Sequence, residues 1–401
     1  MAGWRTRLPM PWAVTGSASG ATLNMPYWRL SGFYFFYFAL LGALVPYWGL
    51  FLRGRGFDAV AIGELMAILM ATKVVAPNIW GWLGDHLGHR MRIVRLASLL
   101  SLLVFCGMFW AQSFWAIALV VALYSFFWNA SLPQFEVVTF SYLKELAPRY
   151  ARIRVWGSIG FIVTVIVLGW LVEWRGAEIL LPSVLFIFVA IWLSALLVRD
   201  PDPEPHPQHQ QSLAQILKKP AIIGFFVSVF LMQASHGPYY AFYSIFMTDH
   251  GYTETLIGQL WALGVLAEVG LFVVMHHLLE RFGARRVLVF SMLAAALRWL
   301  LIGGFADSLA SLVIAQLLHA ATFGTFHAAG IHLVQHYFRG RHKGRGQALY
   351  SSVSFGAGGA VGSLSSGYAW EGLGPAMTFG TASMIAILGA FVAWRWVDGD
   401  R

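Results

Sequence analysis

Glu268 lies in the middle of about 20 nearly uninterrupted apolar residues, within the stretch 251–286. An ionised group at the centre of a membrane-length helix is costly, so such a residue is a functional candidate. Arg298 and His319 occupy the next two apolar runs, and helix spacing around the intervening turns brings all three to one depth. A carboxylate, a guanidinium and an imidazole in a water-lined cavity suit proton coupling, in which the arginine holds the carboxylate ionised or releases it to be protonated.

His327 follows His319 by two helical turns and lies on roughly the same helix face, so we add it to the predicted proton-coupling residues. A structural alternative remains, in which Glu268, Arg298 and His319 only tie helices together. The histidines of this run fit no standard metal-binding spacing, and we predict no metal and no cofactor.

A second set of residues is expected to bind a small-molecule substrate. Glu136 and Arg154 are eighteen residues apart across a turn, so antiparallel helices bring them to similar depth and predict an ion pair. The alternative is an arginine that only marks the membrane interface. His236 precedes Gly237 and Pro238, where proline interrupts helical hydrogen bonding and polar groups often line a cavity. The predicted substrate-binding residues are Lys73, Glu136, Arg154, His236, Tyr47, Tyr240, Tyr243 and Asn129. Ordinary packing is the alternative for each tyrosine, and hydrogen bonding between helices is the alternative for Asn129.

The composition identifies the elements that must position these residues. Hydrophobic residues make up 58% of the chain, charged residues 11%, and the mean hydropathy is +0.66. Soluble domains carry about 25% charged residues, so an ordinary globular protein is excluded and an all-α integral membrane protein in a lipid bilayer is predicted. Twelve apolar runs have the length of a membrane-spanning helix. They are 29–52, 59–80, 92–110, 114–143, 152–173, 179–198, 221–247, 254–279, 286–305, 309–335, 346–368 and 374–396.

The net charge of +9 reflects topology rather than affinity for nucleic acid. Lys and Arg collect in the loops on one side of the predicted spans, which places that side and both termini in the cytoplasm and the protein in the inner (plasma) membrane. A Pro-rich polar break separates the spans six and six. The predicted organisation is an N-terminal tail (1–26), a six-helix bundle (27–198), a cytoplasmic linker (199–220) and a second six-helix bundle (221–397).

The two predicted bundles repeat one another at an offset of 195 residues. Gly56-Phe57 matches Gly251-Tyr252, and Asp85, Gly88 and Arg90 match Glu280, Gly283 and Arg285. Parallel repeats of this kind place a binding site near the midplane between the halves. The same offset takes Lys73 to Glu268, so opposite charges occupy equivalent positions in the two halves.

The loop GWLGDHLGHR (81–90), placed after the second of twelve spans, resembles the cytoplasmic signature of the major facilitator superfamily. The resemblance implies a fold of two pseudo-symmetric six-helix halves and a latch between conformational states. The predicted gating residues are Gly81, Asp85, Gly88, Arg90, Glu280, Gly283 and Arg285. His276 replaces the first glycine in the second half, so we expect the latch there to be weaker.

The charge layout also resembles that of lactose permease-like symporters, with one departure: Thr322 stands where those proteins have an acid after the histidine. The runs 150–161, 236–246, 251–269 and 316–330 are more similar to the 3-phenylpropionate:proton symporter branch. This resemblance implies a monomeric proton-coupled symporter for an aromatic carboxylate, working by alternating access. A sugar or nucleoside:proton symporter and a drug:proton antiporter are the alternatives. A membrane enzyme or a receptor is disfavoured, because no nucleophile, metal or phosphate motif supports catalysis and a receptor needs no acid–base groups at the midplane.

Overall fold

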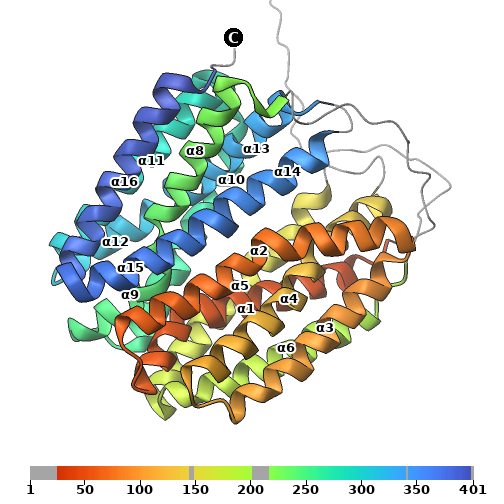
Figure 1. Ribbon diagram of the computed structural model, residues 1–401, viewed down its shortest axis with the longest axis horizontal. Helices are drawn as coiled ribbons and strands as arrows, with labels where there is room; N and C mark the ends of the chain where they lie inside the picture. Colours follow the sequence, from red (N-terminus) through yellow and green to blue (C-terminus); the bar gives the residue numbers. More distant parts are fainter. Residues whose placement is uncertain (1–24, 144–148, 201–215, 340–341, 399–401) are drawn as a thin grey trace, which may run out of the picture.

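A computed structural model describes residues 25–143, 149–200, 216–339 and 342–398, and these are entirely helical apart from turns (Figure 1). The tail 1–24 and most of the predicted linker, 201–215, lie outside the described residues. The predicted all-α membrane fold with two six-helix halves is confirmed. The first half contains α1 (Tyr27–Gly54), α2 (Ala59–Leu87), α3 (Arg90–Cys106), α4 (Phe114–Leu143), α5 (Tyr150–Arg175) and α6 (Leu180–Leu196). The second contains α8 (Pro220–Ser235), α9 (Gly237–Asp249), α10 (Glu254–Phe282), α11 (Ala284–Gly304), α12 (Leu309–Leu317), α13 (Phe326–Tyr337), α14 (Lys343–Ser351), α15 (Gly359–Leu373) and α16 (Pro375–Trp396).

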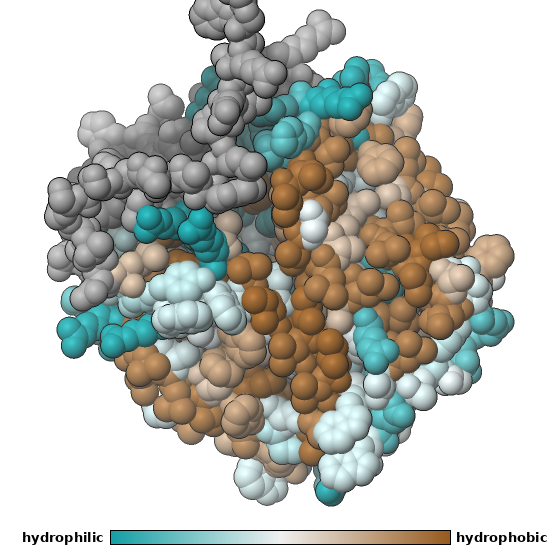
Figure 2. Space-filling model, turned by 180° about the vertical axis from the view of Figure 1, so that it is seen from behind, coloured by the Kyte–Doolittle hydropathy of each residue, from teal (hydrophilic) through white to brown (hydrophobic). Residues whose placement is uncertain are grey.

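Eleven helical segments of the described chain are long and apolar enough to cross a membrane. The predicted span 346–368 is also helical, as α14, the π-helical segment η6 (Ser352–Gly358) and α15, but it is rich in glycine and serine. Its small side chains suit close packing against neighbouring helices, and α2 packs along it. The space-filling view shows apolar surface across the middle of the molecule and polar residues toward its ends (Figure 2), as a bilayer requires.

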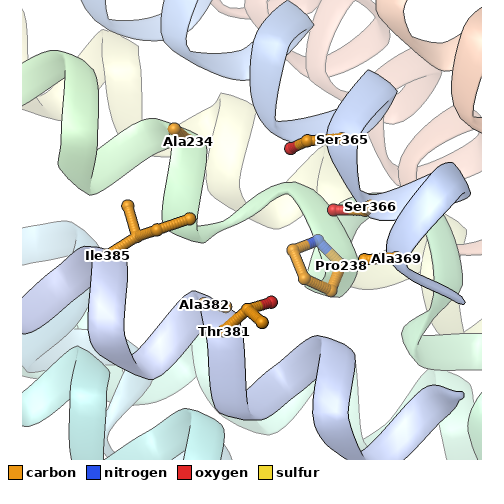
Figure 3. Close-up of a pocket in the computed structure, with 8 residues that line it drawn as sticks. All are labelled: Ala234, Pro238, Ser365, Ser366, Ala369, Thr381, Ala382 and Ile385. Atoms are coloured by element: carbon orange, nitrogen blue, oxygen red, sulfur yellow. The ribbon is translucent and has the colours of Figure 1, made fainter. Parts of the chain in front are cut away.

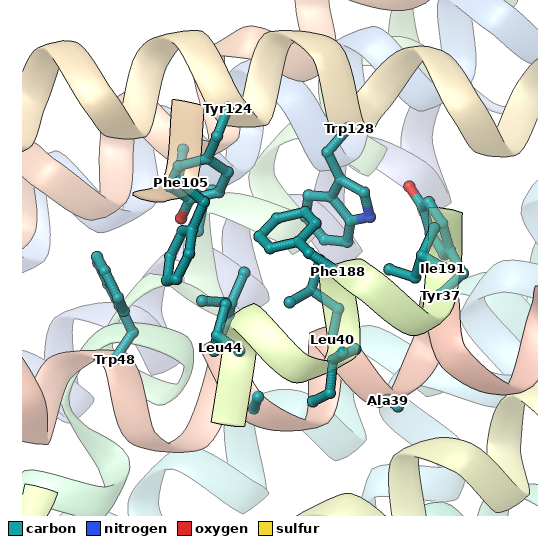
Figure 4. Packing of buried hydrophobic residues seen from close by; sticks show 14 of the residues in the cluster. Tyr37, Ala39, Leu40, Leu44, Trp48, Phe105, Tyr124, Trp128, Phe188 and Ile191 are labelled. Atoms are coloured by element: carbon teal, nitrogen blue, oxygen red, sulfur yellow. The ribbon is translucent and has the colours of Figure 1, made fainter. Parts of the chain in front are cut away.

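Each half has its own apolar core. In the first half, Leu40 and Leu44 of α1 pack with Phe105 of α3, Trp128 of α4 and Phe188 of α6 (Figure 4). A second cluster fills the C-terminal half around Trp261, Trp299 and Phe379. Both clusters also cross the contact between the halves: Phe242 and Ile245 of α9 belong to the first, and Val165 of α5 belongs to the second.

The internal repeat is visible in the backbone. Gly56 and Gly251, which are 195 residues apart, both adopt positive φ, at +86° and +80°. Two residues later, the Asp58 and Thr253 side chains accept hydrogen bonds from backbone N–H groups in the first turns of α2 and α10. Gly88, which ends α2, also has positive φ, as does its equivalent in the second half. Glycine adopts this conformation without the steric cost that a Cβ imposes, so the same turn chemistry starts and stops equivalent helices.

The halves meet along α2 with α15 and α5 with α10. We call the end where α6 stops and α8 begins the linker end. At the opposite end, Arg53 of α1 donates to Asp249 at 2.5 Å and to Thr248 at 2.7 Å, both at the end of α9. Glu173 of α5 also accepts from the backbone N–H of Thr255 at 3.1 Å.

A further link at the opposite end joins Tyr368 of α15 to Glu64 of α2 at 2.9 Å. The ribbons of the two bundles converge at this end and diverge toward the linker end (Figure 1). The opposite end is therefore the one that inter-half hydrogen bonds hold closed.

We expect Arg53→Ala to shift the protein toward a conformation that is open at the opposite end, because the α1–α9 ion pair is lost. Arg55→Ala is the matched control: Arg55 pairs with Glu178 at 3.1 Å at the same end, but within one half.

Spin labels on exposed Trp110 and Asp307, after replacement of Cys106 by serine, report the distance between the halves at this end. Arg53→Ala is expected to lengthen that distance distribution and Arg55→Ala to leave it unchanged. Equal behaviour of the two variants would contradict the assignment of Arg53 as the closing contact.

Candidate functional site

The structure brings Glu268 of α10 and His319 together, with 3.5 Å between Oε2 and Nε2. Their side chains are 13% and 7% exposed. Two glycines make the approach possible. A Cβ on Gly264 would lie 3.2 Å from His319 Cβ, and a Cβ on Gly324 would lie 3.2 Å from Glu268 Cγ. Gly324 belongs to the π-helical segment η4 (Ala320–Thr325) that joins α12 to α13.

Arg298 of α11 has different partners. It is fully buried, donates from Nε to the Ala315 carbonyl at 2.8 Å and from Nη1 to the Thr322 hydroxyl at 3.2 Å. The Tyr239 ring covers its guanidinium at 4.0 Å. No carboxylate of the described residues lies within 4.0 Å of it, so the predicted triad divides into a Glu268–His319 contact and an arginine held by neutral oxygens and an aromatic face.

Two residues that the sequence analysis did not select complete this environment. The Gln316 side-chain oxygen accepts from Arg298 Nη2 at 3.2 Å and from the Tyr239 hydroxyl at 2.9 Å. A signal for both was present: Tyr239 directly follows the proline break, and Gln316 is a polar residue one turn before His319. Thr322, which occupies the position of the missing acid, contributes a hydroxyl to the same arginine.

In the first half, Glu136 and Arg154 do not form the predicted direct ion pair, since no oxygen–nitrogen distance between them is within 4.0 Å. The Tyr150 hydroxyl donates to Glu136 at 3.0 Å, and the Phe38 ring covers the Arg154 guanidinium at 3.8 Å. Arg154 lies on α5, which packs against α10, the helix that carries Glu268.

Lys73 is half-buried on α2, and its amine contacts the Met70 sulfur at 3.6 Å. None of the described carboxylates lies within 4.0 Å of it. The α2 backbone at Lys73 packs against Gly356 of η6, so the lysine belongs to the contact between the halves. Its neighbour Thr72 accepts a hydrogen bond from Asn129 of α4 at 2.9 Å. Asn129 therefore links two helices beside the lysine.

The predicted aromatic residues occupy two kinds of environment. The Tyr47 hydroxyl donates to the Val165 carbonyl at 2.5 Å and ties α1 to α5, and Tyr243 is fully buried among aromatic rings. In this conformation both are packing residues. Tyr240 is half-buried, and its ring lies 5.6 Å from that of His236 at the α8–α9 break. The His236 Nδ1 atom contacts the Met232 carbonyl at 2.8 Å.

His327 is half-buried on α13, and its Nδ1 atom lies 3.5 Å from the Tyr350 hydroxyl of α14. It does not contact Glu268 directly. The predicted proton-coupling residues thus occupy one region of the C-terminal half, with His327 nearer the linker end than His319.

The junction of α2 and α3 is held together by charged and polar contacts. Asp85 pairs with Arg90 at 2.5 Å, and Arg90 donates to Gln134 of α4 at 2.6 Å. A Cβ on Gly84 would lie 2.5 Å from the Gln134 side-chain oxygen, whereas a Cβ on Gly81 would have no contact closer than 4.0 Å. The close approach that the motif requires is therefore made at Gly84.

The equivalent loop after α10 has fewer internal contacts. Gly283 adopts a φ of +76°, as the repeat predicts, and Arg285 donates to the Trp394 carbonyl of α16. Glu280 is exposed and makes no ion pair with Arg285 within 4.0 Å. Asp85 and Arg90 thus form an ion pair in the first half, whereas their equivalents Glu280 and Arg285 do not pair with each other in the second half.

A cavity of about 230 Å³ lies where α8 breaks into α9, against α15 and α16 (Figure 3). Small and apolar side chains line it, together with the hydroxyls of Ser365, Ser366 and Thr381. It contains none of the predicted substrate-binding residues and no charged side chain, so it lacks the chemistry to bind a carboxylate.

Comparisons with known proteins agree with this architecture. The family model described as "MFS_1 like family" matches residues 27–381. The chain is 28% identical over 369 residues to a "Probable 3-phenylpropionic acid transporter" of Escherichia coli (strain K12), a match that covers 90% of this chain and 95% of the relative. It is 27% identical over 273 residues to a maltose permease of Geobacillus stearothermophilus, covering 67% and 68%.

A crystal structure of a mutant of the nucleoside transporter NupG superposes with a TM-score of 0.81 at 18% identity, covering 93% of this chain and 100% of that chain. At this identity the likeness concerns the fold alone. The matched family and relatives are transporters, which confirms the prediction that the chain is not an enzyme.

We expect Gly84→Ala to be less stable than Gly81→Ala by about 0.5–1.5 kcal/mol, because the added methyl group must displace the end of the Gln134 side chain and break its hydrogen bond with Arg90. Gly81→Ala is the matched control, because its methyl group meets only ordinary contacts. Thermal unfolding in detergent measures both variants. A loss of stability as large for Gly81→Ala as for Gly84→Ala would contradict the assigned close approach.

Proposed function

Since this chain belongs to the MFS_1 like family of membrane transporters, we propose that it is a proton-coupled symporter that carries a small organic anion by alternating access. An aromatic carboxylate of the phenylpropionate kind is the first candidate for the cargo. We infer that the linker end faces the cytoplasm, because the Lys and Arg residues of the short loops collect on that side.

The observation that carries the proton-coupling proposal is the contact between Glu268 and His319. The carboxylate is largely removed from solvent and faces an imidazole instead of a permanently charged side chain. Such a carboxyl group can gain and lose a proton as its surroundings change, whereas a direct Arg298 partner would hold it ionised. The separation of Arg298 from Glu268 therefore supports proton exchange at Glu268.

Two cations that lack a direct carboxylate partner support an anionic cargo. Among the described residues, the Lys73 amine contacts the Met70 sulfur, and the Arg154 guanidinium lies over the Phe38 ring. A charge that is half-buried without a counter-charge attracts one from the cargo. The similarity to the E. coli relative, named as a probable 3-phenylpropionic acid transporter, agrees with a cargo that combines a carboxylate and a ring.

A neutral sugar-like cargo is the second candidate. Among the described residues, Glu136 accepts one hydrogen bond, from the Tyr150 hydroxyl, and its carboxylate retains capacity to accept from cargo hydroxyl groups. The maltose permease among the relatives favours the same chemistry. The contribution of Lys73 separates the two candidates, since only a carboxylate needs its charge.

We expect Glu268→Gln to abolish accumulation of cargo driven by a proton gradient while leaving cargo exchange across the membrane largely intact. Glutamine preserves the size of the side chain but cannot take up a proton. Uptake of phenylpropionate into proteoliposomes, with and without an imposed pH gradient, measures both activities. Glu371→Gln, at an exposed position at the end of α15, is the control. Uphill uptake by Glu268→Gln at the wild-type level would refute the coupling role.

We expect Lys73→Met to weaken carboxylate cargo about tenfold or more, since a charge-assisted hydrogen bond contributes about 1.5–3 kcal/mol. Methionine keeps an apolar stem beside Met70, and Lys73→Arg, which keeps the charge, should retain part of the affinity. Competition of phenylpropionate and its uncharged amide for uptake or binding provides the measurement. An equal loss for the acid and the amide would remove the argument for an anionic cargo.

A further inference from the structure

Three rings of the C-terminal half form a column. The Phe323 ring lies parallel to the His319 ring, with 5.5 Å between centroids and 9° between planes. The Phe323 ring is also nearly parallel to the His327 ring, with 6.3 Å between centroids and 11° between planes. The phenyl ring is therefore interposed between two imidazoles that are eight residues apart.

The helix geometry explains this alignment. In a regular α-helix, side chains four residues apart differ in direction by about 40° around the helix axis. Three side chains at positions i, i+4 and i+8 would therefore point in progressively different directions. The segment η4 is π-helical, and its wider turn rotates side chains in the opposite sense over the same four residues. One π turn inside the helix cancels the drift and keeps His319, Phe323 and His327 on one face.

Each imidazole has its own polar partner. His319 contacts the Glu268 carboxylate at 3.5 Å, and His327 faces the Tyr350 hydroxyl at 3.5 Å. His327 and Phe323 are half-buried, whereas His319 is buried. The Glu268–His319 pair therefore lies at the less exposed end of the column.

The column cannot conduct a proton as it stands. The N–H groups and the nitrogen lone pairs of an imidazole lie in the plane of the ring, so stacked rings do not form hydrogen bonds through their faces. The phenyl ring between them has neither a donor nor a nitrogen or oxygen acceptor. Direct transfer from His327 to His319 is therefore blocked while Phe323 remains between them.

We propose that Phe323 is an aromatic barrier that prevents proton leakage between a linker-side group, His327 with Tyr350, and the Glu268–His319 pair. The inference rests on the proposed proton coupling and adds a positioning residue to it. A symporter needs such a barrier, because a continuous path through one half would dissipate the proton gradient without moving cargo.

The surroundings of the column reinforce the barrier. Phe355 of η6 packs 5.9 Å from both Phe323 and His327, which closes the side toward α14. Further titratable or charged groups lie on neighbouring helices. They include Arg154 of α5, His236 at the α8–α9 break, Tyr239 and Tyr240 of α9, and Arg298 of α11.

The test measures proton leakage in proteoliposomes without cargo, with a potassium diffusion potential as the driving force and an internal pH-sensitive dye as the readout. Phe323→Ala is expected to acidify the lumen several-fold faster than wild type, because the space left by the ring admits water between the imidazoles. Phe323→His is expected to leak as well, since a third imidazole supplies nitrogens between the other two. Phe323→Leu keeps an apolar side chain in place and should remain as tight as wild type.

Wild-type leak rates in both Phe323→Ala and Phe323→His would overturn the barrier. So would a Phe323→Leu variant that leaks as fast as Phe323→Ala, because loosened packing would then be the cause. Tight variants that lose cargo uptake would instead make Phe323 a cargo contact. Adding Glu268→Gln to Phe323→Ala should restore the wild-type rate, and persistence of the leak would place the path elsewhere.

The outcome is separable from that of the proposed function. A wild-type protein that shows no proton-driven uptake, but whose Phe323 variants leak as expected, would refute symport and leave the barrier intact. Normal proton-driven uptake by the wild type, with no leak in any Phe323 variant, would support symport and refute the barrier.

Discussion

The cost of an ionised group in hydrocarbon governs how this protein is built. Each charged side chain within the spans must find a compensating environment, and the structure provides a different one each time. Arg298 is surrounded by carbonyl, amide and hydroxyl oxygens and an aromatic face. Glu268 has an imidazole, and Arg154 has the face of a phenyl ring. None of these solutions is a simple buried ion pair, so each charge retains the ability to respond to a proton or to a cargo.

Small residues allow neighbouring helices to approach closely enough to form these environments. The Glu268–His319 contact exists because Gly264 and Gly324 allow α10 to approach the helix that carries the histidine. Gly356 likewise brings η6 against the backbone of α2 at Lys73. In a membrane, where helices gain little from hydrophobic burial against one another, such close backbone contacts stabilise the assembly. The glycine- and serine-rich character of the span 346–368 therefore belongs to this contact between the halves and explains the low hydropathy of that span.

The two halves contribute different chemistry to the region between them. The first half supplies Lys73 and Arg154, which have no direct carboxylate partner among the described residues, and the second supplies the carboxyl–imidazole contact. The halves are fastened at the opposite end through Arg53 and Asp249, while the ribbons diverge at the linker end (Figure 1). In the proposed cycle, cargo and proton would thus meet groups from both halves, and motion of one half relative to the other would change both environments together.

The sequence by itself determined the class of the protein and its internal symmetry. Membrane-length apolar runs, a Pro-rich break and an offset of 195 residues predicted two helical bundles, because hydrophobic length and turn-forming glycines act locally along the chain. The sequence also predicted that Glu268 and His319 lie at one depth in the membrane, because the rise per residue of a helix is fixed.

Only the tertiary structure decided which groups touch. The depth of a residue in the membrane does not determine the direction in which its side chain points from the helix axis. The Arg298 side chain hydrogen-bonds to Thr322 and Gln316 and does not contact Glu268. Glu136 contacts Tyr150 and not the predicted Arg154. The spacing of residues also did not predict the π-helical turn that places Phe323 between His319 and His327. Those outcomes depend on side-chain directions and close backbone approaches between segments distant in sequence, which the packed fold alone defines.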